Sequence, residues 1–193
     1  MKTAKVWRGQ KVILREKHLS DAHDDYRWRS DEELARLDAA PPLRMSFHDY
    51  LRLYEDELRY PYPWSRRFAI DTLDGKHIGN CMYYDIDYTA GEAELGIMIG
   101  EKDYWSRGYG TDAVNTLLSI IFTETPLKRI YLHTLEWNVR AQRSFAKAGF
   151  TAVRTVRRNG HTFVRMEITR EQWLRLQEAQ AGRIPRRAPP PPG

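Results

Sequence analysis

The sequence predicts an α/β protein of the α+β kind, in which helices cover both faces of one mixed, mostly antiparallel sheet of six to seven strands. Short runs rich in branched apolar residues alternate with longer segments whose apolar residues recur at helical spacing. Three of the short runs follow one another across turn sequences, which is typical of antiparallel hairpins. A strand, a long helix and a further strand come next, and this order favours a mixed sheet between layers of helices.

Length and composition fit one globular domain. The chain has 193 residues, of which 41% are apolar and 30% are charged, and chains of roughly 100–200 residues usually make one domain. We expect residues 1–182 to form that domain. Residues 183–193 combine three arginines with a run of prolines, and because such a segment buries little we expect it to be a flexible tail.

Charge, hydropathy and cysteine content argue against several classes of protein. The net charge is +5, but the tail supplies three positive charges, which leaves 5 − 3 = +2 for residues 1–182. Nucleic-acid binding is therefore not expected to be the main role. No apolar run approaches the roughly 18 residues that span a bilayer, so we expect neither a membrane span nor a signal peptide. The single cysteine suits a reducing compartment, and we expect a cytoplasmic monomer or homodimer.

The N-terminal third is predicted to hold one strand and three helical segments. Residues 11–15 are rich in branched apolar side chains and are predicted to form the first strand. A helix is expected over residues 20–29, capped by the serine at its start. Ser30 and Glu33 have the spacing of a capping box and predict a further short helical turn. Apolar residues then recur at helical spacing over residues 46–58.

The middle of the chain is predicted to form three hairpin-linked strands and a long helix. The strands are expected over residues 67–72, 77–88 and 92–100, separated by Asp-Gly and Ala-Gly turns. A loop leads from the third strand to a helix over residues 111–123. Its apolar residues follow the i, i+3, i+4, i+7, i+8 pattern, which predicts one buried face.

The C-terminal third returns to the sheet. A strand is predicted over residues 129–135, followed by a helix that starts at Asn138 and ends at Gly149. Two strands are expected on either side of the Asn-Gly turn at residues 159–160. A Thr-x-x-Gln capping box then opens a last helix over residues 169–181.

The loop before the long helix has glycines at a spacing that suits an anion. Residues 107–111 read Arg-Gly-Tyr-Gly-Thr, and glycines followed by the first turn of a helix offer unpaired N–H groups to a phosphate. A simple tight turn is the alternative. The loop also matches G-x-G-x-x-A through Ala113, with Glu136 as the later acid. A dinucleotide site is nevertheless disfavoured, because seven residues separate these glycines from the preceding strand.

Two segments carry a resemblance to a known family. Residues 94–113, ELGIMIGEKDYWSRGYGTDA, and residues 138–150, NVRAQRSFAKAGF, resemble the GNAT superfamily of N-acetyltransferases, and its RimJ/RimL-type branch in particular. The resemblance extends over about residues 12–173. It implies a splayed sheet and transfer of an acetyl group from acetyl-CoA to a primary amine: a protein N-terminal α-amine, a polyamine or another small amine.

The resemblance also implies how acetyl-CoA is bound. Backbone N–H groups of the glycine loop would hold the pyrophosphate, and the pantetheine arm would pair with the strand before it as an added strand does. An N–H of that strand would also face the developing oxyanion. The implied cofactor-binding residues are Ile97, Met98, Ile99, Ser106, Arg107, Gly108, Tyr109, Gly110, Thr111, Asn138 and Phe145.

Two departures from the family pattern bear on chemistry. Trp105 stands where Gln or Arg is usual, and Phe145 stands where many relatives carry a tyrosine that protonates the departing thiolate. Ser144, a tyrosine from elsewhere or water would have to replace that acid. The departure at Phe145 also favours an alternative function, a non-catalytic GNAT-fold module that binds acyl-CoA as a sensor or partner domain. A longer acyl group is a further alternative.

Glu94 is the candidate catalytic residue. An acceptor amine is mostly protonated at neutral pH and must lose a proton before it attacks a thioester, so a nearby carboxylate suits the role of general base. Glu94 lies fourteen residues before Gly108, which is the offset of the strand-borne glutamate base in the resembled family. Strand alternation places it with Gly96 and Met98 on one face, where an acid is either exposed to solvent or functional.

Other nucleophiles and ligands are weaker candidates. Cys81 has no histidine beside it in the sequence and is expected to be core rather than an acetyl-carrying nucleophile. The six histidines are isolated, so no metal site is predicted. Aromatic and acidic residues between positions 26 and 64, among them Tyr50, Tyr54 and Asp38, would suit a cationic amine, although aromatic residues at this spacing are commonly core.

Overall fold

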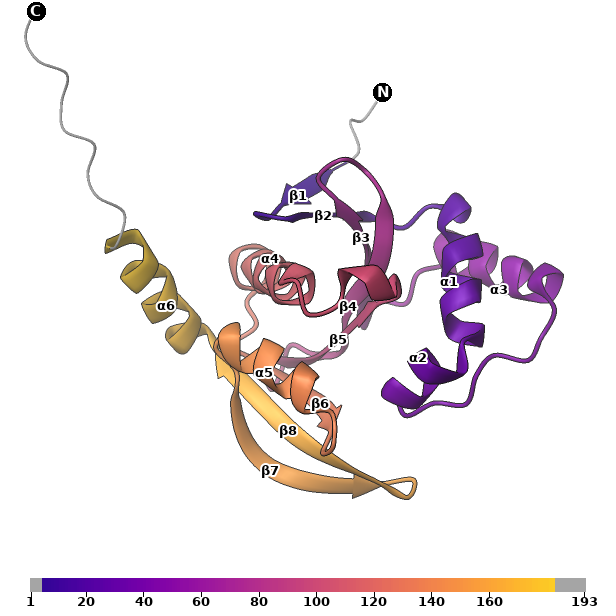
Figure 1. The fold of residues 1–193 in the computed structure, drawn as a ribbon. Helices are drawn as coiled ribbons and strands as arrows, with labels where there is room; N and C mark the ends of the chain where they lie inside the picture. The colour runs from indigo at the N-terminus through magenta and orange to yellow at the C-terminus, as the bar shows by residue number, and fades with distance from the viewer. Residues whose placement is uncertain (1–4, 183–193) are drawn as a thin grey trace, which may run out of the picture.

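A computed structural model describes residues 5–182, which form one eight-stranded sheet with helices on both faces (Figure 1). The strands are β1 (Val6–Arg8), β2 (Val12–Glu16), β3 (Ser65–Thr72), β4 (His77–Asp87), β5 (Glu92–Ile99), β6 (Arg129–Leu135), β7 (Thr151–Arg158) and β8 (His161–Thr169). The helices are η1 (Leu19–Asp21), α1 (Ala22–Ser30), α2 (Glu32–Leu37), α3 (Phe47–Arg59), η2 (Lys102–Tyr104), α4 (Tyr109–Glu124), α5 (Val139–Lys147) and α6 (Arg170–Gly182). The tail expected at residues 183–193 lies outside the described residues.

The mixed, mostly antiparallel sheet is confirmed, but the predicted strand count is too low. The strand order is β1-β2-β3-β4-β5-β6-β8-β7, and only β5 and β6 run parallel. The unpredicted strand is β1, which has three residues and pairs with β2. Three residues are too few to show a period in the sequence, so β1 exists only through its pairing.

The sheet opens in its middle. β5 and β6 pair only over three residues on each strand, Glu92–Glu94 against Arg129–Tyr131. Beyond Glu94 the two strands separate, while β5 stays paired with β4 up to Ile99. The C-terminal half of β5 therefore faces a gap in the sheet, as the predicted splay requires.

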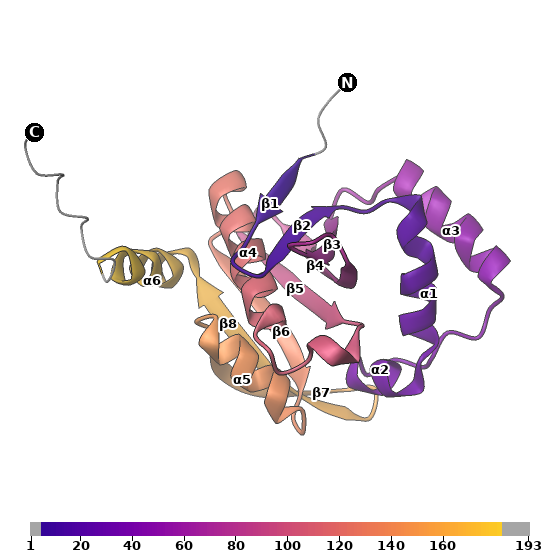
Figure 2. The same ribbon diagram turned by 45° about the horizontal axis from the view of Figure 1, so that its top comes forward.

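The two faces of the sheet carry different helices. Figure 2 shows α4 and α5 together on one side and α1, α2 and α3 together on the other. The main core lies under α4, where Leu117, Leu118 and Ile121 pack against Phe68 and other buried strand residues. Burying each such side chain stabilises the fold by roughly 1.5–3 kcal/mol. The long helix thereby holds its own N-terminus beside the opening in the sheet.

Helix caps confirm some sequence predictions and correct others. Asn138 caps α5 as predicted, and Ser46 caps α3, each accepting a backbone N–H with its side chain. Ser20 and Ser30 do not act as predicted: Asp21 precedes α1, and Asp31 caps α2 by accepting from the Leu34 N–H at 2.9 Å. Ser30 is the last residue of α1 and has helical backbone, so it cannot cap the next helix. Asp31 has the extended conformation that a cap needs.

Candidate active site

Two clefts meet where the sheet opens. The first, here called the glycine-loop cleft, has a volume of about 540 Å³ and lies between the loop before α4 and helix α5. The second, here called the α3 cleft, has a volume of about 720 Å³ and lies between α1, α3 and strands β3 to β5. Asp38, Ile97 and Met98 line both clefts. Two ligands bound in the two clefts would therefore touch each other at the C-terminal half of β5.

The glycine loop presents backbone donors to its cleft. Ser106 and Gly108 have positive φ angles of 57° and 86°, and α4 begins immediately after them at Tyr109. Left-handed backbone before a helix turns successive N–H groups to one side, and the first turn of the helix leaves its N–H groups unpaired. Asp112 anchors the arrangement, because its carboxylate accepts from the backbone N–H groups of Lys11 at 2.7 Å and Val12 at 3.0 Å. The loop therefore has the backbone geometry of an anion site.

Helix α5 supplies positive charge to the opposite wall. Arg140, Arg143 and Lys147 line the glycine-loop cleft together with Ser144. Their spacing places them on one face of the helix, and the sequence analysis missed them although that spacing was readable. Ser144 Oγ lies 2.8 Å from Thr111 Oγ1, which ties α5 to the first turn of α4. Cations and unpaired N–H groups facing one cleft suit a ligand with phosphates.

Most of the predicted cofactor-binding residues line this cleft. They are Ile97, Met98, Ile99, Ser106, Gly108, Gly110, Thr111, Asn138 and Phe145. Arg107 and Tyr109 do not line it: Arg107 Nη1 donates to the Asp103 carbonyl at 3.1 Å, and the Tyr109 ring packs edge-on against Tyr104. For these two residues the sequence analysis expected backbone contacts, which stay a prediction.

Trp105 and Phe145, the two departures from the family pattern, have structural roles. The Trp105 indole donates to the Ile99 carbonyl at 2.7 Å, so it fixes the end of β5. The guanidinium of Arg140 lies 3.9 Å from the centre of the Trp105 ring. Phe145 is buried and packs edge-on against Phe150. Neither side chain can give a proton to a thiolate, and Ser144 is the hydroxyl nearest to Phe145 in the sequence that lines the cleft.

Glu94 lies at the point where β5 and β6 separate and is 5% exposed. Strand alternation left open whether Glu94 is exposed to solvent, and its burial excludes that alternative. His133 Nδ1 lies 2.7 Å from Glu94 Oε1, and because an ionised carboxylate only accepts, the imidazole donates this hydrogen bond. Glu94 lines neither cleft, but Tyr84, its partner on β4, lines the α3 cleft. Burial and the adjacent Glu94 carboxylate raise the pKa of Tyr84.

His133 is a site residue that the sequence analysis missed. The histidines were considered only as metal ligands, and Glu94 lies 39 residues from His133 in the chain. The parallel register pairs Tyr131 with Glu94, and His133 follows two residues later on the same face. Only the strand order brings the two side chains together.

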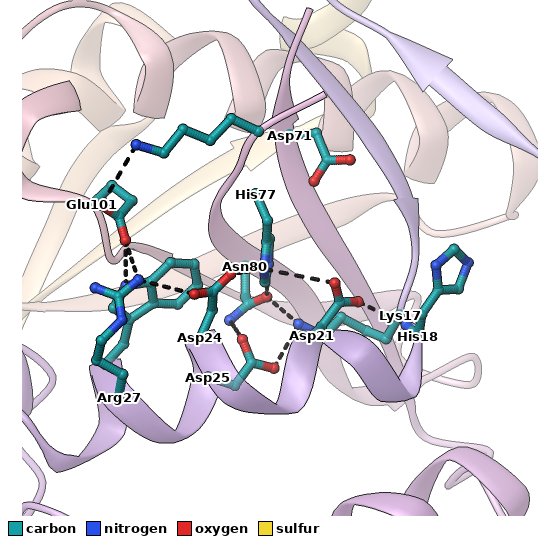
Figure 3. Close-up of polar contacts among 12 residues, drawn as sticks. Lys17, His18, Asp21, Asp24, Asp25, Arg27, Asp71, His77, Asn80 and Glu101 are labelled. Carbon is teal, nitrogen blue, oxygen red and sulfur yellow. Dashed lines mark hydrogen bonds and ion pairs between the residues drawn. The ribbon is translucent and has the colours of Figure 1, made fainter. Parts of the chain in front are cut away.

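Paired polar side chains form the floor of the α3 cleft. Figure 3 shows Asp25 and Asn80 pointing at each other with Lys17 beside them. Asp25 accepts from Tyr54 Oη at 2.8 Å and Asn80 Nδ2 at 2.6 Å, and forms an ion pair with Lys17 Nζ at 2.7 Å. Burial lowers the pKa of Lys17, and the Asp25 charge opposes that shift. Tyr50 and Tyr54 line the cleft although they are almost fully buried.

Cys81 is 2% exposed and part of the main core, as expected. Burial raises the pKa of its thiol, which keeps it protonated and unreactive at neutral pH. Within residues 5–182, no group of three or more His, Cys, Asp or Glu side chains is arranged to hold a metal ion. The same residues include no helix with the length and apolar character that crossing a bilayer requires.

Comparisons with known proteins agree with this geometry. The acetyltransferase (GNAT) domain family matches residues 11–151. The uncharacterized N-acetyltransferase p20 of Bacillus licheniformis is 28% identical over 123 residues, which cover 63% of this chain and 68% of the relative.

Solved structures share the fold. Spermidine N-acetyltransferase from Vibrio cholerae, in complex with CoA and spermine, superposes with a TM-score of 0.75 and 22% identity, over 84% of this chain and 98% of that one. Aminoglycoside acetyltransferase AAC(6')-Ib, in complex with coenzyme A, has a TM-score of 0.72 and 21% identity, over 86% of this chain and 99% of that one. The family match spans most of the chain and includes the loop and strand where the two clefts meet, so the chain belongs to the acetyltransferase (GNAT) family of acetyl-CoA-dependent N-acetyltransferases.

Proposed function

We propose that this chain transfers an acetyl group from acetyl-CoA in the glycine-loop cleft to a primary amine in the α3 cleft. The observation that carries the proposal is the shared lining of the two clefts by Ile97 and Met98. Both cavity volumes lie in the range of small-molecule sites. A thioester at the end of one cleft and an amine at the end of the other would lie in contact, which group transfer requires.

The residues of the glycine-loop cleft fit acetyl-CoA. Backbone N–H groups from Ser106 to Thr111 are proposed to hold the pyrophosphate, with Arg140, Arg143 and Lys147 adding charge. The pantetheine arm would lie along the unpaired edge of β5, beside Asn138. The Ile99 carbonyl already accepts from Trp105, so other backbone groups of that edge would pair with the arm.

Glu94 is proposed as the general base, acting at a distance. It lines neither cleft, so the proton of the acceptor would reach it through a water molecule or the Tyr84 hydroxyl. The amine nitrogen then attacks the thioester carbon, and an N–H near Met98 stabilises the oxyanion. Collapse of the tetrahedral intermediate breaks the C–S bond, and the thiolate of CoA takes up the proton that the attacking nitrogen loses as it becomes an amide. His133 holds the Glu94 carboxylate in place for this step.

Three acceptor classes follow from the RimJ/RimL-type resemblance: protein N-terminal α-amines, polyamines and other small amines. The neighbouring structures bear on the choice, since one holds spermine and another belongs to an aminoglycoside acetyltransferase. A sensor that only binds acyl-CoA gains no support from the α3 cleft, because such a module needs no second cleft at the thioester.

Release of CoA thiol from acetyl-CoA tests the proposal directly. The acceptor panel comprises spermidine, kanamycin, free lysine and a short peptide with an unblocked N-terminus. Glu94→Gln is expected to lower turnover by roughly 10²–10⁴-fold while CoA binding stays intact. Glu92→Gln is the matched control, because Glu92 lies on the same strand, pairs with Arg129 and lines neither cleft. If no amine is acetylated, transfer to an amine is wrong; if Glu94→Gln is as active as Glu92→Gln, Glu94 is not the base.

A further inference from the structure

Asp38 occupies the junction of the two clefts. It follows α2 directly and lines both cavities with Ile97 and Met98. Those two neighbours are apolar, so Asp38 supplies the only ionisable side chain among the described residues that the two clefts share. A charge at this point faces the place where the reacting groups of both substrates would meet.

The Asp38 carboxylate accepts no hydrogen bond and forms no ion pair within residues 5–182. Other acids that line the α3 cleft, Asp25 and Glu57, are bound by neighbouring side chains. Asp25 is bound by Lys17, Tyr54 and Asn80, and Glu57 pairs with Arg67. Asp38 is exposed, so solvent rather than another side chain solvates its carboxylate. Asp38 is thus available to a ligand.

The backbone beside Asp38 is strained in a way that fixes its position. Ala39 has a φ of 53°, a left-handed conformation that a residue with a side chain rarely adopts. Hydrogen bonds from the Asp38 N–H to the Leu34 carbonyl at 3.0 Å and from the Ala40 N–H to the Ala35 carbonyl at 3.0 Å hold this turn. Such strain persists where the surrounding structure imposes it, and it collects at ligand sites.

The surroundings of Asp38 favour a cationic ligand. Asp38 is exposed, but the surrounding cleft walls partly desolvate its carboxylate, and this desolvation raises its pKa. The positive charge of Arg29, which lines the α3 cleft, opposes the shift but does not cancel it. A cation placed directly on the carboxylate would replace the missing solvation.

We propose that Asp38 binds the ammonium group of the acceptor and holds it against the thioester, as the residue that selects a primary amine. The inference rests on the proposed function, because it takes the α3 cleft as the acceptor site. Asp38 acts in binding, whereas Glu94 receives the proton. Loss of Asp38 should therefore raise the KM for the amine, while loss of Glu94 should lower kcat.

A binding experiment tests this without turnover. The full chain is labelled with [methyl-¹³C]methionine and saturated with free CoA, and the Met98 methyl signal is assigned with Met98→Leu. n-Butylamine, protonated at pH 7, is titrated as the minimal ammonium probe, with 1-butanol as its uncharged counterpart. The Met98 signal should respond to butylamine, and the affinity should fall at least about tenfold in Asp38→Asn. Asp38→Glu, which keeps the charge, should stay within a few-fold of the wild type.

Asp56→Asn is the matched control. Asp56 lies on α3, lines neither cleft and has no side-chain partner among the described residues, so butylamine should bind this variant as it binds the wild type. Equal affinity in Asp38→Asn and the wild type would overturn the proposal, as would a Met98 signal that ignores butylamine or responds equally to butanol.

Steady-state kinetics with an acceptor found by the thiol-release assay separates the two proposals. A tenfold or larger rise in the amine KM of Asp38→Asn, with the acetyl-CoA KM unchanged, supports the role of Asp38. Acetylation with an unaltered amine KM in Asp38→Asn leaves the transferase function standing and removes Asp38 from it. Butylamine binding that depends on Asp38, without acetylation of any amine, has the opposite meaning: the ammonium site exists and the transferase proposal fails.

Discussion

The two clefts offer a ligand different kinds of contact. The glycine-loop cleft offers backbone N–H groups and three cations on one face of α5, and those cations form no ion pair with acids in the described part of the chain. The α3 cleft is lined by side chains that mostly hold each other, such as Lys17 with Asp25 and Arg67 with Glu57. The difference indicates which substitutions each cleft should tolerate. The glycine-loop cleft depends on backbone shape and net charge, whereas the α3 cleft depends on individual side chains.

The largest expected effect concerns the charged network behind the α3 cleft. Arg15 donates to both Asp21 oxygens, at 2.9 and 2.8 Å, and also to Asp71. Asp21→Asn removes one partner of a buried ion pair and should lower the free energy of unfolding by about 3–5 kcal/mol. Asp24→Asn is the control, because the Asp24 side chain is 36% exposed against 4% for Asp21 and pairs with the exposed Arg27 (Figure 3). Urea unfolding at pH 7 measures the free energy of unfolding of both variants. Equal losses in Asp21→Asn and Asp24→Asn would mean that the buried ion pair stabilises the fold no more than the exposed one.

The same network predicts a pH dependence. Burial would raise the pKa of Asp21, but hydrogen bonds from Arg15 and the His18 N–H outweigh it and lower the pKa to about 2. A carboxylate whose pKa is depressed on folding contributes stability above its unfolded pKa of about 3.9, and loses it as pH falls toward the folded value. The stability difference between wild type and Asp21→Asn should therefore shrink between about pH 4 and pH 2. A constant difference over that range would contradict the assigned pKa.

The next largest effect tests the backbone of the glycine loop. Gly108→Val places a β-branched residue at a φ of 86°, which such residues strongly disfavour, so the loop must change shape. CoA affinity should fall at least about 100-fold, and the rise in Tm on adding CoA should disappear. Gly75→Val is the matched control, since Gly75 has a φ of 90° in a turn with nothing within 4 Å of an added Cβ. Retained CoA stabilisation in Gly108→Val would remove the loop from the site.

A smaller effect is expected from single charges in the same cleft. Arg143 lines the glycine-loop cleft, so Arg143→Gln should weaken CoA binding by about tenfold at low salt and by less at high salt. The KM for the amine should not change. Arg157→Gln, on β7 and away from both clefts, should bind CoA normally. Isothermal titration with CoA at two salt concentrations measures both variants; equal affinities would show that Arg143 does not contribute to CoA binding.

The smallest effect is predicted for the C-terminal tail, which we propose is no part of the folded domain. Deleting residues 183–193 should change the free energy of unfolding by less than about 0.5 kcal/mol, because the segment is rich in proline and arginine and has little apolar surface to bury. CoA should raise the Tm of the truncated protein as it does that of the full chain. An appreciably earlier unfolding transition would show that the tail packs on the domain.

Local chemistry determined much of this molecule. Helical spacing, hairpin turns and the cap at Asn138 identified nearly every long element, because these signals depend on residues a few positions apart. The glycine loop was readable for the same reason, since its donors belong to one contiguous segment. Strand β1 could not be predicted, because three residues are too few to show a period. The residues that precede α1 and α2 could not be predicted either, because they depended on where the preceding helical segment ended.

Only the tertiary structure decided how the acceptor side is built. The contact of Glu94 with His133 depends on the pairing of β5 with β6, and the shared lining of the two clefts by Asp38 and Met98 depends on where the fold places the end of α2. No local pattern specifies either arrangement. Strand order and helix docking minimise the apolar area left exposed by the whole chain, and that total is a property of all the elements together.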